Sequence, residues 1–199
     1  AFKMLKELIS TDIDAITFQI PEPSFYEKNK AWGLALSKNF YKEAIDFTHK
    51  NNKLIGFAIA DKDMIDFFNS AGADFWKSLS ISISDDALLH ELQKTNKTIF
   101  VSTGISGERE IVKISKKLKN IKFLHTQLSH NIEDANLKAI ERLKKVTKKE
   151  IAFGLHYSDY RVLYVALAFE PSDIFFYVKD NAKEKFPDNE YALMIDSVN

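Results

Sequence analysis

Apolar and polar positions along this chain follow two alternating periods. Short apolar runs of strand length are separated by longer segments in which apolar residues recur every three or four positions. The short runs predict buried strands and the longer segments predict amphipathic helices. Strands are expected in the first half of residues 74–89 and at 14–20, 54–60, 97–103, 121–127, 150–156 and 173–178.

Helices are expected between these strands. Asp61 and Gly72 are predicted to bound one of them as its cap and its stop signal. The others are predicted at residues 2–9, 41–50, 84–94, 107–118, 133–146, 158–169 and 191–198, while residues 21–39 are expected to be a loop.

Strict alternation of helices with nearly continuous apolar strands predicts a parallel sheet covered by helices. The pattern fits an α/β fold of the (β/α)8 TIM-barrel type with its first strand absent. A doubly wound parallel sheet is the structural alternative.

The stretch at residues 74–89, DFWKSLSISISDDALL, organises the predicted fold. Its first half places Lys77 inside an apolar, aromatic strand, where a lysine is costly to bury without a partner or a ligand. Ser84 is expected to cap the helix that follows, with acidic residues in its positive first turn. Because α/β proteins place their sites where strands end, Lys77 and Ser80 are predicted to belong to a site.

Composition narrows the class of protein. The 199 residues predict one domain, 1–199, and the 45% apolar content is that of a globular chain. A formal net charge of zero argues against nucleic-acid or anionic-membrane partners. The chain has no cysteine and no apolar run of the roughly 20 residues that a membrane helix needs. A cytoplasmic location is expected.

Several fragments resemble, in the same order, motifs of the sialic acid synthases, the phosphoenolpyruvate-dependent NeuB-like family. The strand DAITFQI is similar to the family's DAVKFQ, and Lys77-Ser-Leu-Ser80 to its K-I-x-S turn. Further matches are Ser102-Thr-Gly104 to S-T-G, Leu124-His125 to L-H, Glu133-Asp-Ala-Asn-Leu137 to E-D-V-N-L, and Pro187-Asp188-Asn189 to P-D-H.

The resemblance implies a barrel that binds phosphoenolpyruvate and a divalent metal, manganese or magnesium. Such a barrel is a C–C bond-forming transferase that condenses phosphoenolpyruvate with an N-acyl sugar of the N-acetylmannosamine type to a nonulosonic acid. By position, Lys77, Ser80 and Ser102 match phosphoenolpyruvate-binding residues, and Asp188 matches an aspartate near the sugar and the metal.

Two further site residues are less directly aligned. In one alignment, His156 falls close to the position of the family's first metal histidine. If Ser158-Asp159 is instead matched to the family's S-D, Tyr160 takes the position of that histidine. Gln19, at the end of its strand, is a further candidate for binding substrate.

The chain also departs from the family pattern. The family's first-strand motifs and its C-terminal antifreeze-like domain have no counterpart. At single positions, a family lysine is replaced by Thr17, a threonine by Ala58, a glutamate by Ser82, and the histidine of P-D-H by Asn189. The family's second metal histidine falls near Tyr177.

Three functions therefore compete. The first is a sialic-acid-synthase-like enzyme with part of its phosphate clamp and acid/base groups lost. The second is a non-catalytic barrel relative that serves as a binding or assembly module. Its exposed parallel edges predict either a homo-oligomer or a missing N-terminal segment. The third is an aldolase in which Lys77 forms a Schiff base. Structural roles are the alternatives for single residues: Ser80 and Ser102 as polar barrel residues, His125 as a core residue, and Asp188 in a turn.

Overall fold

The computed structural model describes residues 1–30, 34–180 and 188–198. The chain divides into two compact units, unit 1 from Ala1 to Ile99 and unit 2 from Phe100 to Asn199. Within the described ranges, no helix combines the length and the apolar character needed to cross a bilayer.

Unit 1 contains three parallel strands that are hydrogen-bonded in chain order, β1-β2-β3. A helix follows each strand, as in the β/α units of a TIM barrel. Its elements are α1 (Phe2–Ile9), β1 (Ala15–Ile20), α2 (Pro23–Lys28), α3 (Lys38–Lys50), β2 (Leu54–Ile59), η2 (Lys62–Met64), α4 (Ile65–Ala71), β3 (Phe75–Ser78), η3 (Ser80–Ser82), α5 (Asp86–Lys94) and the start of β4 (Thr98–Ser102).

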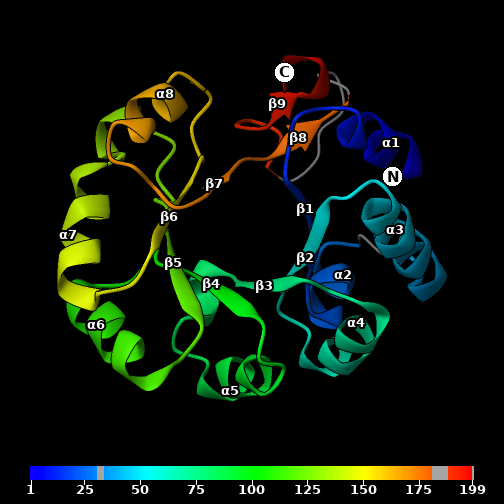
Figure 1. Ribbon diagram of the computed structural model, residues 1–199, viewed down its shortest axis with the longest axis horizontal. Coiled ribbons are helices and arrows are strands. Elements are labelled where there is room, and N and C mark those ends of the chain that lie inside the picture. The colour runs from blue at the N-terminus through cyan, green and yellow to red at the C-terminus, as the bar shows by residue number, and fades with distance from the viewer. Residues whose placement is uncertain (31–33, 181–187, 199) are drawn as a thin grey trace. The chain divides into compact units, whose positions relative to one another are not determined.

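The parallel register gives the sheet of unit 1 two different faces. Phe18, Phe57 and Trp76 form one cross-strand row on the face covered by α3 and α4 (Figure 1). There the Phe57 ring stacks on Phe68 of α4 with centroids 3.9 Å apart, and Tyr41 of α3 meets it edge-on. Side chains alternate along a strand, so the neighbouring rows lie on the opposite face.

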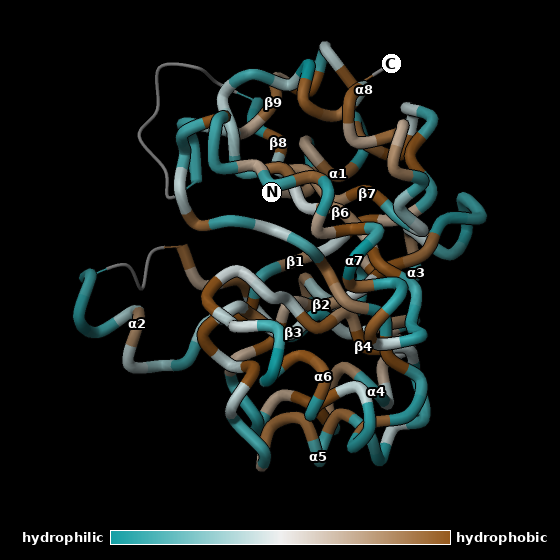
Figure 2. The backbone as a smooth tube through the Cα atoms, turned by 90° about the vertical axis from the view of Figure 1, so that its left-hand side faces the viewer, coloured by the Kyte–Doolittle hydropathy of each residue, from teal (hydrophilic) through white to brown (hydrophobic). Residues whose placement is uncertain are grey.

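The longer helices, such as α3 and α5, expose one side and bury the other. In α5, Leu88, Leu89 and Leu92 are buried between polar neighbours. Figure 2 shows the resulting alternation of hydrophobic and hydrophilic positions along this helix. Burial of an apolar stripe provides most of the stability of such short helices.

Unit 2 repeats the same arrangement, with β4, β5, β6 and β7 again in chain order. Figure 1 shows α6 and α7 on one side of β5 and β6. At the amino ends of the strands, Lys122 binds Asp173 at 2.9 Å and Glu150 at 3.4 Å. The further elements are α6 (Glu108–Lys117), β5 (Ile121–His125), η4 (Ile132–Asp134), α7 (Lys138–Thr147), β6 (Ile151–Gly154), α8 (Val162–Leu167), β7 (Ile174–Phe175), β8 (Val178–Lys179), β9 (Leu193–Met194) and η5 (Ile195–Ser197).

The fold is therefore of the predicted α/β, TIM-barrel-like class. Within each unit, strands that are neighbours in the sequence are also neighbours in the sheet, which argues against the doubly wound alternative. A doubly wound sheet reverses its strand order at a switch point. Neither β1-β2-β3 nor β4-β5-β6-β7 contains such a reversal.

Four local predictions were wrong or incomplete. The predicted loop at 21–39 contains α2 and the start of α3, and the predicted strand at 173–178 is divided between β7 and β8. The predicted helix at 191–198 instead forms β9 and η5, because Leu193 donates its N–H to the Tyr177 carbonyl and pairs β9 with β8. Asp85, and not Ser84, caps α5 through a 2.9 Å bond from the Leu88 N–H. Gly72 ends α4 in the left-handed conformation, as expected.

A close backbone approach in unit 1 gives a stability test. A Cβ at Gly56 would lie 2.2 Å from Cε2 of Phe75, its register partner on β3. We expect Gly56→Ala to lower the free energy of unfolding by about 1–3 kcal/mol, because the buried Phe75 ring must shift. Denaturant unfolding measures the change.

Gly107→Ser is the matched control, because a Cβ there meets nothing within 4 Å and Ser is a good helix N-cap. Equal stability of Gly56→Ala and wild type would show that Phe75 does not fill the space above Gly56.

Candidate functional site

Lys77 lies in a cross-strand row on the face of unit 1 opposite α3 and α4. Its register partner is Ala58, which in turn pairs with Gln19. Lys77 is buried, with 8% of its surface exposed, as the sequence predicted, whereas the Gln19 side chain is exposed. Unit 1 thus brings two of the predicted site residues onto one face of its sheet.

Hydroxyl groups follow this lysine along the chain, at the end of β3 and in the turn after it, with Ser78 on the opposite face of the strand. Ser78 is fully buried, and its Oγ has no hydrogen-bond partner among the described residues. Ser80 begins η3 and is half-buried, and Ser82 is buried at the end of the same turn. A cation followed by hydroxyl groups is a combination that binds anionic oxygens.

Ser102 occupies the corresponding strand end in unit 2. It is buried on the same face of β4 as Phe100, whose ring meets Phe175 of β7 at 4.8 Å. Phe175 pairs with Gly154, and a Cβ at Gly154 would lie 3.3 Å from Cβ of Thr126. Ser102 and Thr126 therefore share one face of the sheet of unit 2.

Thr126 and Tyr157 were missed by the sequence analysis. Both are buried, and neither hydroxyl has a hydrogen-bond partner among the described residues. Burial, followed by the nearby Asp134 charge, raises the pKa of Tyr157 to about 12, so its phenol stays protonated. The only feature of the sequence that could have identified them is their position, because Thr126 follows the end of β5 and Tyr157 follows soon after the end of β6.

His125 is packed as a core residue. It is buried at the end of β5, and its Nε2 lies 3.1 Å from the Ala135 carbonyl oxygen. Burial lowers the pKa of His125 below its ordinary value. The neutral imidazole therefore holds the loop after β5 against the strand.

The remaining predicted residues, His156 and Asp188, belong to one group of side chains in unit 2, here called the aromatic cluster: His156, Tyr177, Asp188 and Tyr191. His156 stacks on Tyr191 with centroids 4.8 Å apart and an interplanar angle of 16°. The Tyr191 hydroxyl donates a hydrogen bond to Oδ1 of Asp188. His156 and Asp188 thus meet the same tyrosine, whereas Pro187 of the matched motif lies outside the described residues.

The aromatic cluster does not supply a complete donor set for a divalent metal. Such metals take several carboxylate, carbonyl or imidazole ligands. In the described ranges, no three His, Cys, Asp or Glu side chains are grouped so that they could hold an ion. Tyr160, the alternative to His156, is half exposed and packs on Tyr164 at 6.4 Å.

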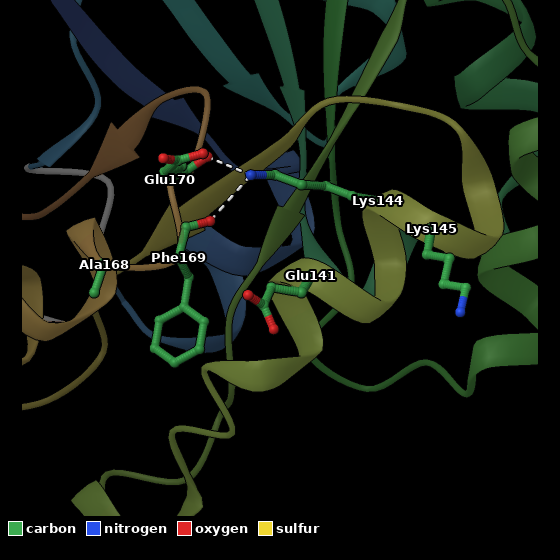
Figure 3. Close-up of a pocket in the computed structure, with 6 residues that line it drawn as sticks. All are labelled: Glu141, Lys144, Lys145, Ala168, Phe169 and Glu170. Atoms are coloured by element: carbon green, nitrogen blue, oxygen red, sulfur yellow. Dashed lines mark hydrogen bonds between the residues drawn. The ribbon is translucent and has the colours of Figure 1, made fainter.

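An open pocket on the outer side of unit 2 has a structural explanation. Figure 3 shows Lys144 directed at the last turn of α8, where it donates hydrogen bonds to the carbonyl oxygens of Phe169 and Glu170. This is a cap for the end of a helix. The pocket is lined by Glu141, Lys144, Lys145, Ala168, Phe169 and Glu170, which precede the amino ends of strands, so it contains none of the predicted site residues.

The buried state of His125 predicts a pH effect on stability. Its folded-state pKa is depressed, so the unfolded chain takes up a proton that the folded chain does not as pH falls below about 6.5. Wild type should lose stability from pH 7.5 to 5.5 more steeply than His125→Gln, by at most about 1.4 kcal/mol per pH unit. Urea unfolding across this range measures both slopes, and equal slopes would contradict the prediction.

The unpartnered hydroxyl of Thr126 predicts that an isosteric apolar residue is tolerated. We expect Thr126→Val to raise the free energy of unfolding by about 1 kcal/mol, because a buried polar group without a partner is removed. Thr103→Val is the control, since the Thr103 hydroxyl donates to the Leu124 carbonyl at 3.3 Å. A loss of stability in Thr126→Val as large as in the control would show that the Thr126 hydroxyl is hydrogen-bonded.

Comparison with known proteins gives one consistent set of relatives. N,N'-diacetyllegionaminic acid synthase of Campylobacter jejuni is 28% identical over 144 residues, 68% of this chain and 43% of that protein. A pseudaminic acid synthase of the same species is 25% identical and covers 93% of this chain and 61% of that protein. The chain thus spans about half the length of the curated relatives it matches.

Solved structures show the same fold. The N-acetylneuraminic acid synthetase of Leptospira borgpetersenii, in complex with citrate, superimposes with a TM-score of 0.89 at 24% identity, covering 98% of this chain and 73% of the other. The spore coat polysaccharide biosynthesis protein SpsE of Bacillus subtilis gives a TM-score of 0.84 at 16% identity, covering 99% and 60%. Together with a match of the NeuB family pattern to residues 4–198, these findings show that the chain belongs to the NeuB family.

Proposed function

We propose that this protein is a synthase of the NeuB type, which condenses phosphoenolpyruvate with an open-chain N-acyl sugar to give a nonulosonic acid and phosphate. The observation that carries the proposal is the buried cation of Lys77, followed by hydroxyl groups at the carboxyl end of β3. Two of its relatives are named as synthases of N,N'-diacetyllegionaminic acid and of pseudaminic acid, which supports a nonulosonic acid as the product.

In the proposed reaction, C3 of phosphoenolpyruvate forms a bond to the aldehyde carbon of the sugar. The aldehyde oxygen takes a proton, water adds to C2, and inorganic phosphate leaves as C2 becomes a ketone. Negative charge is concentrated on the phosphate and carboxylate of the substrate, so catalysis depends on cations and hydrogen-bond donors placed around them.

Each predicted residue has a proposed role in binding substrate. Lys77 would bind the phosphate or carboxylate through its ammonium group, with a hydrogen bond from Ser80. Ser102 of unit 2 is proposed to bind phosphoenolpyruvate on the family match alone. Gln19, in the row of Lys77, would donate an amide hydrogen bond. Asp188 would accept hydrogen bonds from sugar hydroxyl groups.

A non-catalytic relative is the second candidate, because neutral side chains stand where the family has charged ones. Thr17 lies in the row of Gly56 and Phe75 on the lysine's face of the sheet, and Ser82 is buried after the lysine. Neither side chain can replace the charge of the family's lysine or glutamate. The homo-oligomer, the single-domain organisation and the cytoplasmic location stay predictions.

Binding of phosphoenolpyruvate tests the proposal directly. We expect saturable binding to wild type by calorimetry. Lys77→Met removes a charged hydrogen-bond donor but keeps an unbranched side chain, and it should lose about 1.5–3 kcal/mol of binding free energy, roughly 10- to 150-fold in affinity. Lys97→Met is the matched control. Lys97 is also part-buried in unit 1, but its ammonium donates to the Ala73 carbonyl before the amino end of β3.

A second measurement separates the two candidate functions. Release of phosphate from phosphoenolpyruvate upon addition of N-acetylmannosamine would support the synthase. Binding of phosphoenolpyruvate without phosphate release would support the non-catalytic relative. Folded wild-type protein that does not bind phosphoenolpyruvate would overturn the placement of the phosphate site at Lys77.

A further inference from the structure

Helix α8 of unit 2 is apolar along its whole length. Its sequence, VLYVAL, contains no charged residue. Val162 and Ala166 are buried and attach the helix to unit 2, whereas Tyr164, Val165 and Leu167 are 68%, 55% and 54% exposed. A helix that is apolar on every side is normally buried on every side. The outward side of α8 is therefore suited to a covering partner.

The neighbouring helices of the same unit have a different outward side. Every exposed residue of α6 and α7 is charged, and in α7 these residues are Lys138, Glu141, Arg142 and Lys145. In α8 every exposed residue is uncharged. Exposed apolar patches with polar surroundings are typical of interaction surfaces. The contrast therefore marks α8 as the helix of this unit that meets another molecule.

The outward side of α8 is here called the α8 face and consists of Tyr160, Tyr164, Val165, Leu167 and Ala168. A spacing of four residues places Tyr160, Tyr164 and Ala168 on one side of a helix. Tyr160 is 50% exposed, and its ring lies 6.4 Å from that of Tyr164. Ala168 borders the open pocket of Figure 3, which has a volume of about 570 Å³. The α8 face thus has an exposed ring at its start and a hollow at its end.

The two ends of the α8 face carry opposite charges. The Arg161 side chain at the start is 77% exposed, and its Nε and Nη2 groups donate hydrogen bonds to Asp159. A guanidinium has five N–H donors, so others remain for a partner. Glu170, just after the end, is exposed. An identical helix that runs antiparallel places each arginine near the other copy's glutamate, whereas a parallel copy would place like charges together.

We infer that the α8 face joins two copies of this chain about a twofold axis perpendicular to the helix. Tyr164 then packs on Leu167 of the partner subunit, and Tyr160 lies against the pocket at the end of the partner's helix. Arg161 pairs with Glu170 of the partner subunit. These contacts are self-complementary, as a twofold interface requires, and tyrosine and arginine are residues that interfaces favour. A net charge of zero leaves no long-range repulsion between copies.

Sedimentation velocity over a concentration series tests the interface. Wild type should form a reversible dimer, and Tyr164→Glu should weaken it about 30-fold, the scale of an interface hot spot. Ile81→Glu is the matched control, because Ile81 is 69% exposed but lies in η3 of unit 1. Circular dichroism and thermal unfolding check that both variants are folded. A wild type that stays monomeric throughout the series, or a dimer that Tyr164→Glu leaves intact, would overturn the inference.

Charge reversal tests the antiparallel arrangement. Arg161→Glu should raise the dissociation constant of the dimer about tenfold, because acidic groups of the two copies then face each other. The double variant Arg161→Glu/Glu170→Arg should restore the affinity of wild type. Arg142→Glu is the control without effect on the dimer, since Arg142 of α7 pairs with Glu108 of α6. Losses of affinity that add up in the double variant would show that Arg161 and Glu170 do not pair, which contradicts the twofold arrangement.

Discussion

The parallel register of β1, β2 and β3 is the constraint on which the site in unit 1 depends. It aligns Phe18, Phe57 and Trp76 on one face, where α3 and α4 cover them. The same register necessarily directs Gln19 and Lys77 to the other face, because side chains alternate along each strand. A slip of one residue would bury Lys77 against the helices and expose the aromatic rings. The aromatic packing of the core therefore also fixes the face of the sheet on which the candidate site residue Lys77 lies.

The sequence predicted the features that depend on local patterns. Strands such as Leu54–Ile59 are continuous apolar runs, and Gly72 ends α4 in the left-handed conformation that glycine adopts most easily. The segment at 191–198 was predicted wrongly because its helical periodicity does not reveal that Leu193 finds a backbone partner at Tyr177, far away in the sequence. Pairing between distant segments overrides local propensity and cannot be read from either segment alone.

The candidate site was predictable only in part for a related reason. Lys77 was identified because a charge inside an aromatic strand conflicts with its surroundings. Thr126 and Tyr157 produce no such conflict, since a hydroxyl after a strand is ordinary. Only the structure shows that both hydroxyl groups are buried with no hydrogen-bond partner among the residues that it describes. Tyr191 was assigned to a helix, although it is the residue that contacts both His156 and Asp188. Family motifs identify residues one position at a time, but they do not show which new contacts a substitution makes.

Four of the five departures from the family pattern put an uncharged side chain where the family has a lysine, a glutamate or a histidine. They are Thr17, Ser82, Tyr177 and Asn189, while Lys77 and Asp188 are kept. Neutral groups cost less to bury, so the fold loses nothing by these changes. Binding of a substrate in its ground state needs only a few well-placed contacts, whereas acceleration of the reaction needs groups that interact more strongly as charge develops. Under the proposed function, the retained lysine and aspartate would favour continued recognition of the substrates, and the loss of the other charges would lower the rate of condensation more than the affinity.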